Sequence, residues 1–305
     1  MQNWIQLDEK PAAQEIYMIA GWRQWADAGS ISSLLPEYLI EHTNARKIGQ
    51  FDPGGFYIFQ IPGTHHLLRP VIKLQDGYRQ SFERRENEFY YSGNDEKGVV
   101  IFIGDEPHMD VERYAQGFFE IISELNIKRV VALGGVYGSM PYNKNRDISC
   151  IYSLKQMRSE LEEYAMRFSD YEGGATIGSY LVDQAEDHDV EALAMYSFVP
   201  AYDFNQMASM PQGLRIESDY KAWHDLMRRI NHMFGTAIDL VELEEQSIEL
   251  IRAMDKKIDE LIDHYPEMNI REFFDKLEEE YHEQTFAPLD DVWEQEINDL
   301  FKDED

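Results

Sequence analysis

Four short, fully apolar segments, each ending abruptly in a loop rich in Gly, Pro and aromatic residues, constrain the fold of this chain most strongly. Runs of this length, rich in Val and Ile and bounded by breakers, are typical of strands buried on both faces. Helical patterns lie between them, which predicts an α/β fold with a mainly parallel central sheet and crossover helices. The four segments are Ile16–Trp22, Val99–Pro107, Val130–Pro141 and Ala192–Tyr202.

The loops that follow parallel strands gather along one edge of the sheet, which we call the crest. Open α/β sheets bind their ligands at this edge, so crest residues are the first candidates for a site. None of the four loops contains a complete catalytic signature. The fold is therefore predicted more sharply than any activity.

The composition is that of a globular chain. Of its 305 residues 43% are hydrophobic, which is enough for one large domain and an appendage. No apolar run approaches the roughly 20 residues of a membrane span. The N-terminal Met1–Lys10 lacks the pattern of a secretory signal. The single cysteine, Cys150, excludes an internal disulfide, and together these features predict a cytoplasmic protein.

The net charge of −30 argues against two classes of partner. Phosphate backbones and anionic membranes would be repelled, so neither nucleic acid nor a membrane is expected as a partner. The charge is also unevenly distributed, because Ala237–Asp305 holds 24 Asp and Glu residues against 6 Lys and Arg residues. This imbalance suggests a separate acidic module.

From Tyr220 onward the apolar pattern is wholly helical, with apolar residues at steps of three and four. Pro288 and Asp290 open a last predicted helix. We expect a core domain over residues 1–219 and an acidic helical extension over residues 220–305. Such helices can form a coiled coil with another chain or pack on their own domain, and the pattern leaves both alternatives open.

Short strand patterns lie between the first and second apolar segments. Val71–Leu74 and Tyr78–Phe82 flank Asp76-Gly77, which is a strong hairpin signal. We expect the stretch Phe51–Tyr91 to form antiparallel additions beside the parallel sheet.

The crest loop Gly104–Asp110 is the one richest in side chains that could take part in acid–base or metal chemistry. Glu106 and His108 could supply acid or base groups, and the carboxylates could bind a hard metal ion. The alternative is that Asp110 caps the following helix and the other carboxylates are solvated. The spacing matches no ligand motif, so no metal site is expected.

The crest loop Gly134–Pro141 could hold an anion through its backbone N–H groups, with Lys144 and Arg146 as the nearby cations. It lacks the Lys-Ser/Thr ending of a P-loop and the spacing of a dinucleotide fingerprint. The alternative is that its glycines allow a tight turn and close packing.

Three further features have simpler explanations than catalysis. Trp22, Trp25 and Asp27 in the first crest loop could line a pocket or an oligomer contact. His65 and His66 are adjacent, so they point to opposite faces of a strand and cannot share a metal ion. Cys150 stands in a strand-like segment, which indicates a buried apolar thiol.

The crest motifs follow one another in a fixed order over residues 15–205. They are Gly21, Trp22, Asp27, Ala28 and Gly29; Phe51, Asp52, Pro53, Phe56 and Tyr57; Asn87, Phe89, Tyr90 and Tyr91; Gly104–Pro107; Leu133–Tyr142; Tyr171–Gly178; and Val199–Tyr202. In this order they resemble the proteasome assembly chaperone family, second-subunit type, in its bacterial and archaeal members. The ordered set is far more specific than any one of its motifs.

This resemblance implies a three-layer α/β/α domain similar to nucleoside phosphorylases, with a C-terminal helical extension as in bacterial members. It also implies a homo-oligomer, with a trimer as one candidate. Some members of the family are chaperones for proteasome assembly. No cofactor is implied.

We therefore expect an assembly or interaction protein of this family, for which the sequence demonstrates no catalysis. Its crest loops and sheet faces would form homo-oligomer contacts, and its acidic helices would meet a protein partner. One alternative is an adaptor that binds a basic partner through the acidic tail. The other is an enzyme or binding protein for nucleoside- or nucleotide-like compounds at a crest pocket. The candidate pocket residues are Trp22, Asp27, Glu106, His108, Gly135, Tyr137 and Tyr202.

Overall fold

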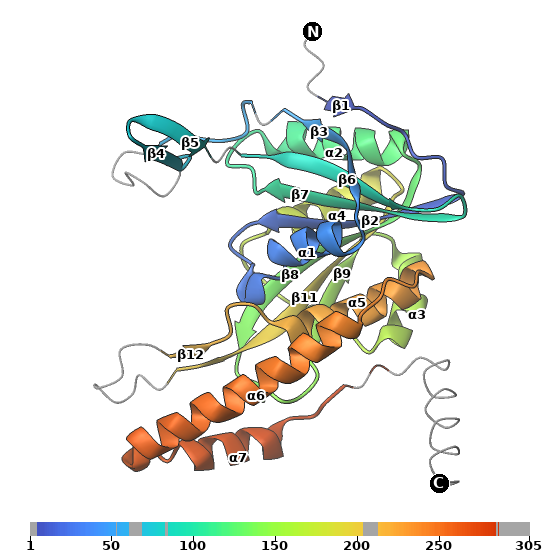
Figure 1. Ribbon diagram of the computed structural model, residues 1–305. Coiled ribbons are helices and arrows are strands. Elements are labelled where there is room, and N and C mark those ends of the chain that lie inside the picture. The colour runs from blue at the N-terminus through green and yellow to red at the C-terminus, as the bar shows by residue number, and fades with distance from the viewer. Residues whose placement is uncertain are drawn as a thin grey trace, which may run out of the picture.

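Helices cover both faces of one large sheet, as Figure 1 shows for the computed structural model. Helices α2 (Val111–Glu124) and α4 (Ile177–Asp187) pack on one face, and α1 (Leu34–His42) and α5 (Tyr220–Phe234) pack on the other. The predicted three-layer α/β/α fold is confirmed. The structure describes residues 5–52, 54–60, 69–82, 85–203, 213–284 and 286.

The four apolar segments form the four adjacent parallel strands at the centre of the sheet, in the order β7-β2-β8-β11. Apolar side chains point to both faces of these strands. In β2, for example, Met18 and Ala20 pack under α2 and α4, whereas Ile19 packs on the other face. The strands are β2 (Glu15–Arg23), β7 (Lys97–Asp105), β8 (Ile127–Gly138) and β11 (Glu191–Tyr202).

Shorter strands extend the sheet on both sides. Beyond β7 lie β6, β3 and β1, each antiparallel to its neighbour, which confirms antiparallel additions there. Beyond β11 lie β9, antiparallel to it, and β10, while β12 pairs with the end of β11. Their bounds are β1 (Ile5–Leu7), β3 (Arg46–Phe51), β6 (Asn87–Gly93), β9 (Ile148–Tyr152), β10 (Arg167–Phe168) and β12 (Leu214–Arg215).

The predicted hairpin exists, but its predicted place is wrong. Strands β4 (Ile72–Gln75) and β5 (Tyr78–Phe82) form a separate two-stranded sheet and do not join the main one. Asp76 and Gly77 both have left-handed φ angles, 50° and 79°, which suit a tight hairpin turn. All residues of both strands are exposed, so no buried face fixes this hairpin on the main sheet.

The helical extension packs on its own domain. The apolar stripe of α5 belongs to the core under the sheet, and the helix ends at Gly235 with a left-handed φ of 59°. Helix α6 (Val241–His264) buries Leu243 and Ile258 in the same core, and α7 (Ile270–Glu280) follows it. The helix expected from Pro288 lies outside the described residues, as do His65 and His66. The boundary at 219/220 stays a prediction.

Short helical turns complete the described chain. Three of them, η2 (Lys155–Met157), α3 (Arg158–Leu161) and η3 (Glu162–Tyr164), lie between β9 and β10. The others are η1 (Ala28–Ser30) and η4 (Pro266–Met268).

Cys150 lies in β9 and is 1% exposed. Burial raises the pKa of its thiol to about 12. The prediction of a buried apolar thiol is confirmed.

Candidate functional site at the crest

The crest is formed by the carboxyl ends of the four parallel strands. After β2 the chain continues to strands on the β7 side of the sheet, whereas after β8 it continues to strands on the β11 side. The crevice between β2 and β8 is therefore the topological switch point, where open α/β sheets bind ligands.

The chain's own backbone closes this crevice. Asp27 and Gly135 form a parallel bridge, and the Gly135 N–H donates to the Ala26 carbonyl at 2.9 Å. A Cβ on Gly135 would lie 2.0 Å from the carbonyl oxygen of Ala28. Glycine at this position allows two backbones to touch, which agrees with the close-packing alternative for this loop.

Asp27 holds the start of α1. Its Oδ1 accepts the backbone N–H groups of Ser32 (2.7 Å) and Ser33 (3.0 Å), and its Oδ2 accepts the Ser33 hydroxyl at 2.6 Å. Burial raises the pKa of this carboxyl, and the hydrogen bonds from Ser33 oppose that shift. Asp27 thus fixes the turn that leads into α1, whose N-cap residue is Ser33.

Glu106 accepts a backbone N–H group at the start of α4. Its Oε1 accepts the N–H of Ile177, the first residue of that helix, at 3.0 Å. A carboxylate at a helix N-terminus is stabilised by the free N–H groups and the helix dipole. Burial nevertheless raises the pKa of Glu106 above its ordinary value of 4.5.

The raised pKa of Glu106 predicts a pH effect on stability. Between its unfolded and folded pKa values, the folded protein binds the proton more often than the unfolded chain does. The contribution of Glu106 to the free energy of unfolding therefore falls as pH rises through this interval. We expect Glu106→Gln to gain stability relative to the wild type as pH rises above 4.5. Urea unfolding of both proteins between pH 4 and pH 7 measures this, and a pH-independent difference would contradict it.

His108 holds a neighbouring loop. Its ring Nδ1 accepts the backbone N–H of Ile58 at 3.1 Å, and the backbone N–H of His108 donates to the Phe56 carbonyl at 2.8 Å. The ring stands edge-on to Tyr57, with 5.6 Å between centroids. Partial burial and the charge of Arg85 lower the pKa of His108. The imidazole is therefore occupied in positioning the segment between β3 and β6.

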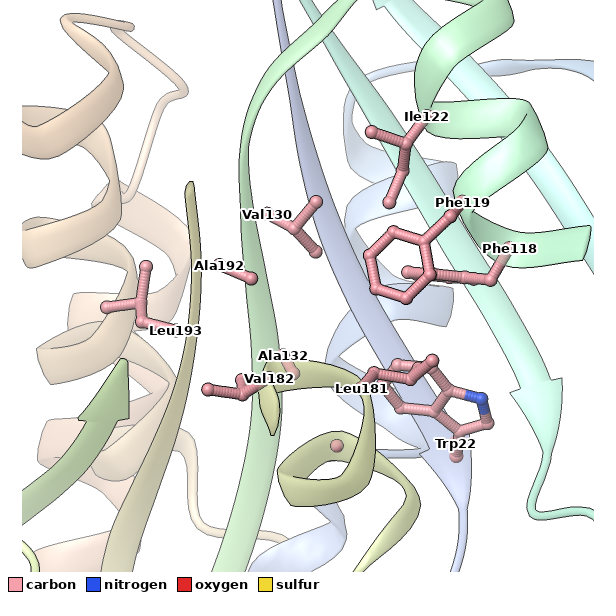
Figure 2. A pocket seen from close by; sticks show the side chains of 11 residues that line it. Trp22, Phe118, Phe119, Ile122, Val130, Ala132, Leu181, Val182, Ala192 and Leu193 are labelled. Carbon is pink, nitrogen blue, oxygen red and sulfur yellow. The ribbon is translucent and has the colours of Figure 1, made fainter. Parts of the chain in front are cut away.

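Trp22 lies below the crest and is fully buried. Its Nε1 donates to the Tyr114 hydroxyl at 2.9 Å, and that hydroxyl donates to Asn87 Oδ1 at 3.0 Å. Figure 2 shows its indole among the side chains that line a small apolar void between α2, α4 and the sheet. The void measures about 10 Å³, which is at most one water in size. It is a packing defect of the core, too small for a ligand.

Tyr137 and Tyr202 have opposite environments at the ends of β8 and β11. Tyr137 is 46% exposed, with the Arg215 guanidinium 5.3 Å from its ring centroid. Tyr202 is buried, and its hydroxyl donates to the Met140 carbonyl at 2.7 Å. The ring of Phe274 in α7 lies 4.7 Å from that of Tyr202. Helix α7 thus covers the crest end of β11.

Sequence reasoning overlooked the ion pair at the centre of the crest. Arg146 and Asp219 have side chains with no exposed surface, and they pair at 2.7 Å (Nε to Oδ2) and 3.1 Å (Nη2 to Oδ1). Asp219 also caps α5 by accepting the Ala222 N–H at 3.1 Å. The suggestion that Arg146 binds an external anion is therefore corrected, because Asp219 already occupies its guanidinium. An Asp before an apolar helical stripe signals a cap, but no local signal names a partner 73 residues away.

The structure brings Asp27 and Gly135 together, whereas the other candidate residues lie in different local environments and do not line one common pocket.

Beside the crest, an open groove of about 590 Å³ lies between the end of β8, β10 and the end of α7. None of the seven candidate residues lines it, and its Arg167 pairs with Asp147 at 2.9 Å. Among the described residues, no three His, Cys, Asp or Glu side chains gather as a metal site.

Fold and crest together define an α/β/α protein whose usual ligand edge is closed by its own chain. The model of the PAC2 family matches residues 22–258, from the crest end of β2 into α6. The chain belongs to the PAC2 family, which confirms the resemblance seen in the crest motifs. No curated protein matches the sequence significantly. Of the helices that the structure describes, none combines the length and the hydropathy that crossing a bilayer requires.

Solved structures with this fold include proteins connected with the proteasome. A proteasome-assembly chaperone homologue from Mycobacterium tuberculosis is 20% identical, with a TM-score of 0.68 over 82% of this chain and 99% of that one. A protein of unknown function from the same organism is 14% identical, with a TM-score of 0.72 over 92% of each chain. An archaeal proteasome activator from Pyrococcus furiosus is 16% identical, with a TM-score of 0.58 over 83% of this chain and 97% of that one. At these identities the likeness establishes the fold.

Proposed function

We propose that this chain is a homo-oligomeric assembly protein of the cytoplasm that binds other proteins and catalyses no reaction. The observation that carries the proposal is the closed crest. The backbone contact between Ala28 and Gly135 fills the switch-point crevice, and the carboxylates of Asp27 and Glu106 accept backbone N–H groups just before α1 and at the start of α4. Enzymes with an open α/β sheet bind their substrates in that crevice, so its closure argues against a substrate site there.

The relatives suggest the class of partner. One structural relative is a proteasome-assembly chaperone homologue, and another is a proteasome activator. We propose that the partners of this chain are subunits of a proteasome-like ring protease. The acidic helices α6 and α7 would present the contact surface, because together they hold 13 Asp and Glu residues against 5 Lys and Arg residues. Residues 220–305 would then act as the partner-binding module on the core of residues 1–219.

Mixing experiments test this proposal. The purified chain is combined with the proteasome α-subunits of its host, and the mass of each species is measured by native mass spectrometry. We expect an oligomer of the chain alone, a trimer being one candidate, and a heavier complex with α-subunits. A monomer at micromolar concentration, or the absence of any mixed complex, would overturn the respective half of the proposal.

A ligand screen tests the small-molecule alternative. Thermal unfolding is followed with inosine, adenosine, ATP and inorganic phosphate at millimolar concentration. A ligand at 100 times its Kd stabilises a folded protein by about 2.7 kcal/mol, which is visible as a rise in Tm. We expect no rise, and a rise with any of the four compounds would favour the alternative.

A further inference from the structure

A short segment that follows α7, which we call the strap, returns to the core and ends in a buried aromatic ring. The strap comprises residues 281–284 and 286. Figure 1 shows it, in red, leaving the end of α7. Phe286 is 5% exposed and belongs to the same core as the apolar stripe of α5. The core therefore binds this part of the acidic extension through a side chain.

The ring of Phe286 occupies a cage of cationic and aromatic side chains. The guanidinium carbons of Arg229 and Arg228 lie 5.0 and 5.9 Å from its centroid, within the range of a cation–π interaction. The ring of Tyr164 is stacked on it with 5.9 Å between centroids, and the His232 ring stands against it at 5.8 Å. An aliphatic side chain would make neither kind of contact, so the cage favours an aromatic ring.

The guanidinium of Arg229 makes the cage electropositive, because no carboxylate pairs with it in the part of the chain that the structure describes. Arg229 is buried and donates to the backbone carbonyls of Tyr164 (2.9 Å), Asp225 (2.9 Å) and Ala165 (3.3 Å). Burial lowers its pKa to about 10, so it stays charged at neutral pH. The electron-rich face of an aromatic ring compensates such a charge, which an aliphatic group cannot do.

Two other strap residues bind the backbone of Asn145, in the loop between β8 and β9. The Tyr281 hydroxyl donates to the Asn145 carbonyl, and Glu283 Oε1 accepts the Asn145 N–H, both at 2.9 Å. Among the described residues, no backbone-to-backbone hydrogen bond joins the strap beyond Tyr281 to the core. A segment that is held by side-chain contacts can leave without unfolding a helix or a strand. Its anchors are a tyrosine, an acid two positions later and an aromatic residue three positions after the acid.

We propose that the cage and the Asn145 backbone form a recognition site for a segment of a partner protein with the pattern Tyr-x-Glu-x-x-Phe, and that the strap occupies this site as a built-in competitor. A tethered segment acts at an effective concentration in the millimolar range, so a free peptide of equal affinity displaces little of it. A partner displaces the strap when it binds more tightly or holds a second surface of the chain as well. This inference goes beyond the proposed function and does not depend on it, because the site requires neither an oligomer nor a ring protease.

A labelled peptide with the sequence of residues 281–287 tests the site in the full-length chain. Phe286→Ala releases the strap, and the milder Phe286→Leu keeps an apolar side chain but removes the ring. We expect fluorescence anisotropy to show binding to Phe286→Ala about tenfold or more tighter than to the wild type, with Phe286→Leu in between. The same peptide carrying Phe286→Ala or Glu283→Ala should bind about tenfold or more weakly. If Phe286→Ala fails to fold, as judged by circular dichroism, Phe286→Leu decides alone.

A second change in the released chain checks that the peptide binds in the cage. His232→Ala removes one wall at an exposed position and should weaken peptide binding by about threefold or more. The matched control is His264→Ala, at an exposed position on α6 where the ring bonds to the Glu260 carbonyl of the same helix, and it should change nothing.

Three results would overturn the recognition site. The first is a peptide that binds the released chains no more tightly than the wild type. The second is binding that ignores both His232→Ala and the substitutions in the peptide, since the peptide would then bind elsewhere. The third is a wild-type oligomer that dissociates in Phe286→Ala, because the occupant would then be the strap of a second copy.

Discussion

Replacing Asp219 with Ala is expected to lower the free energy of unfolding by about 3–5 kcal/mol. The change would leave the guanidinium of Arg146 buried without its counter-charge, because neither side chain has any exposed surface. It would also remove the cap of α5, where Asp219 Oδ1 accepts the Ala222 N–H. Urea or guanidinium unfolding followed by circular dichroism measures the effect.

Two variants separate the causes of this loss. Asp219→Asn keeps an oxygen for the cap and removes the charge, so its stability should lie between those of Asp219→Ala and the wild type. Glu260→Ala removes an exposed pair with Lys256 on α6, whose nitrogen and oxygen are 3.9 Å apart, and should change stability by no measurable amount. If Asp219→Ala were as stable as Glu260→Ala, the buried pair would not hold the crest loop to α5.

Replacing Gly135 with Ala is expected to lower the free energy of unfolding by about 2–3 kcal/mol. The three atoms nearest to the new Cβ, at 2.0, 2.9 and 3.1 Å, all belong to the backbone of Ala28 and cannot rotate away. Moving this backbone would disturb Gly29, whose carbonyl accepts the Asp219 N–H and the Trp223 indole N–H, both at 3.0 Å. The same denaturation experiment measures the loss.

Gly174→Ala is the matched control for Gly135→Ala. A Cβ at Gly174 would meet no atom within 4 Å, and its φ lies outside the left-handed region. The substitution should be neutral or stabilise the protein by up to about 1 kcal/mol through the unfolded chain. Equal stability of the two variants would show a crest with space between β2 and β8, and would revive the small-molecule alternative.

The central sheet could be predicted from sequence because its signal is local and strong. Each parallel strand contains a continuous apolar run, which differs from the spaced apolar residues of an amphipathic helix, and all four occupy the centre of the sheet. The hairpin turn was equally readable from Asp76-Gly77. Its position away from the main sheet was not, because turn chemistry fixes how two strands meet and says nothing of which sheet they join.

The candidate site could be predicted only in part. The sequence drew attention to Asp27, Glu106 and Arg146 because polar residues after buried strands gather at the crest. The partners of these residues could not be predicted, because Glu106 bonds to a residue 71 positions away and Arg146 to one 73 positions away. A single sequence contains no signal for such pairs, so polar crest residues resembled an open site although their side chains bind other parts of the same chain.

The late position in the chain of α6, α7 and the segment that follows α7 has a consequence for synthesis. Tyr142 bonds to Asp255 and the Asn145 N–H to Glu283, so 113 and 138 residues separate these partners. A ribosome adds about 5–20 residues per second, so the crest loop waits on the order of 10 s for its covering helices. In that interval the nascent crest exposes aromatic rings that the finished protein buries. The crest of the growing chain is therefore apolar and uncovered until α6 and α7 have been synthesised.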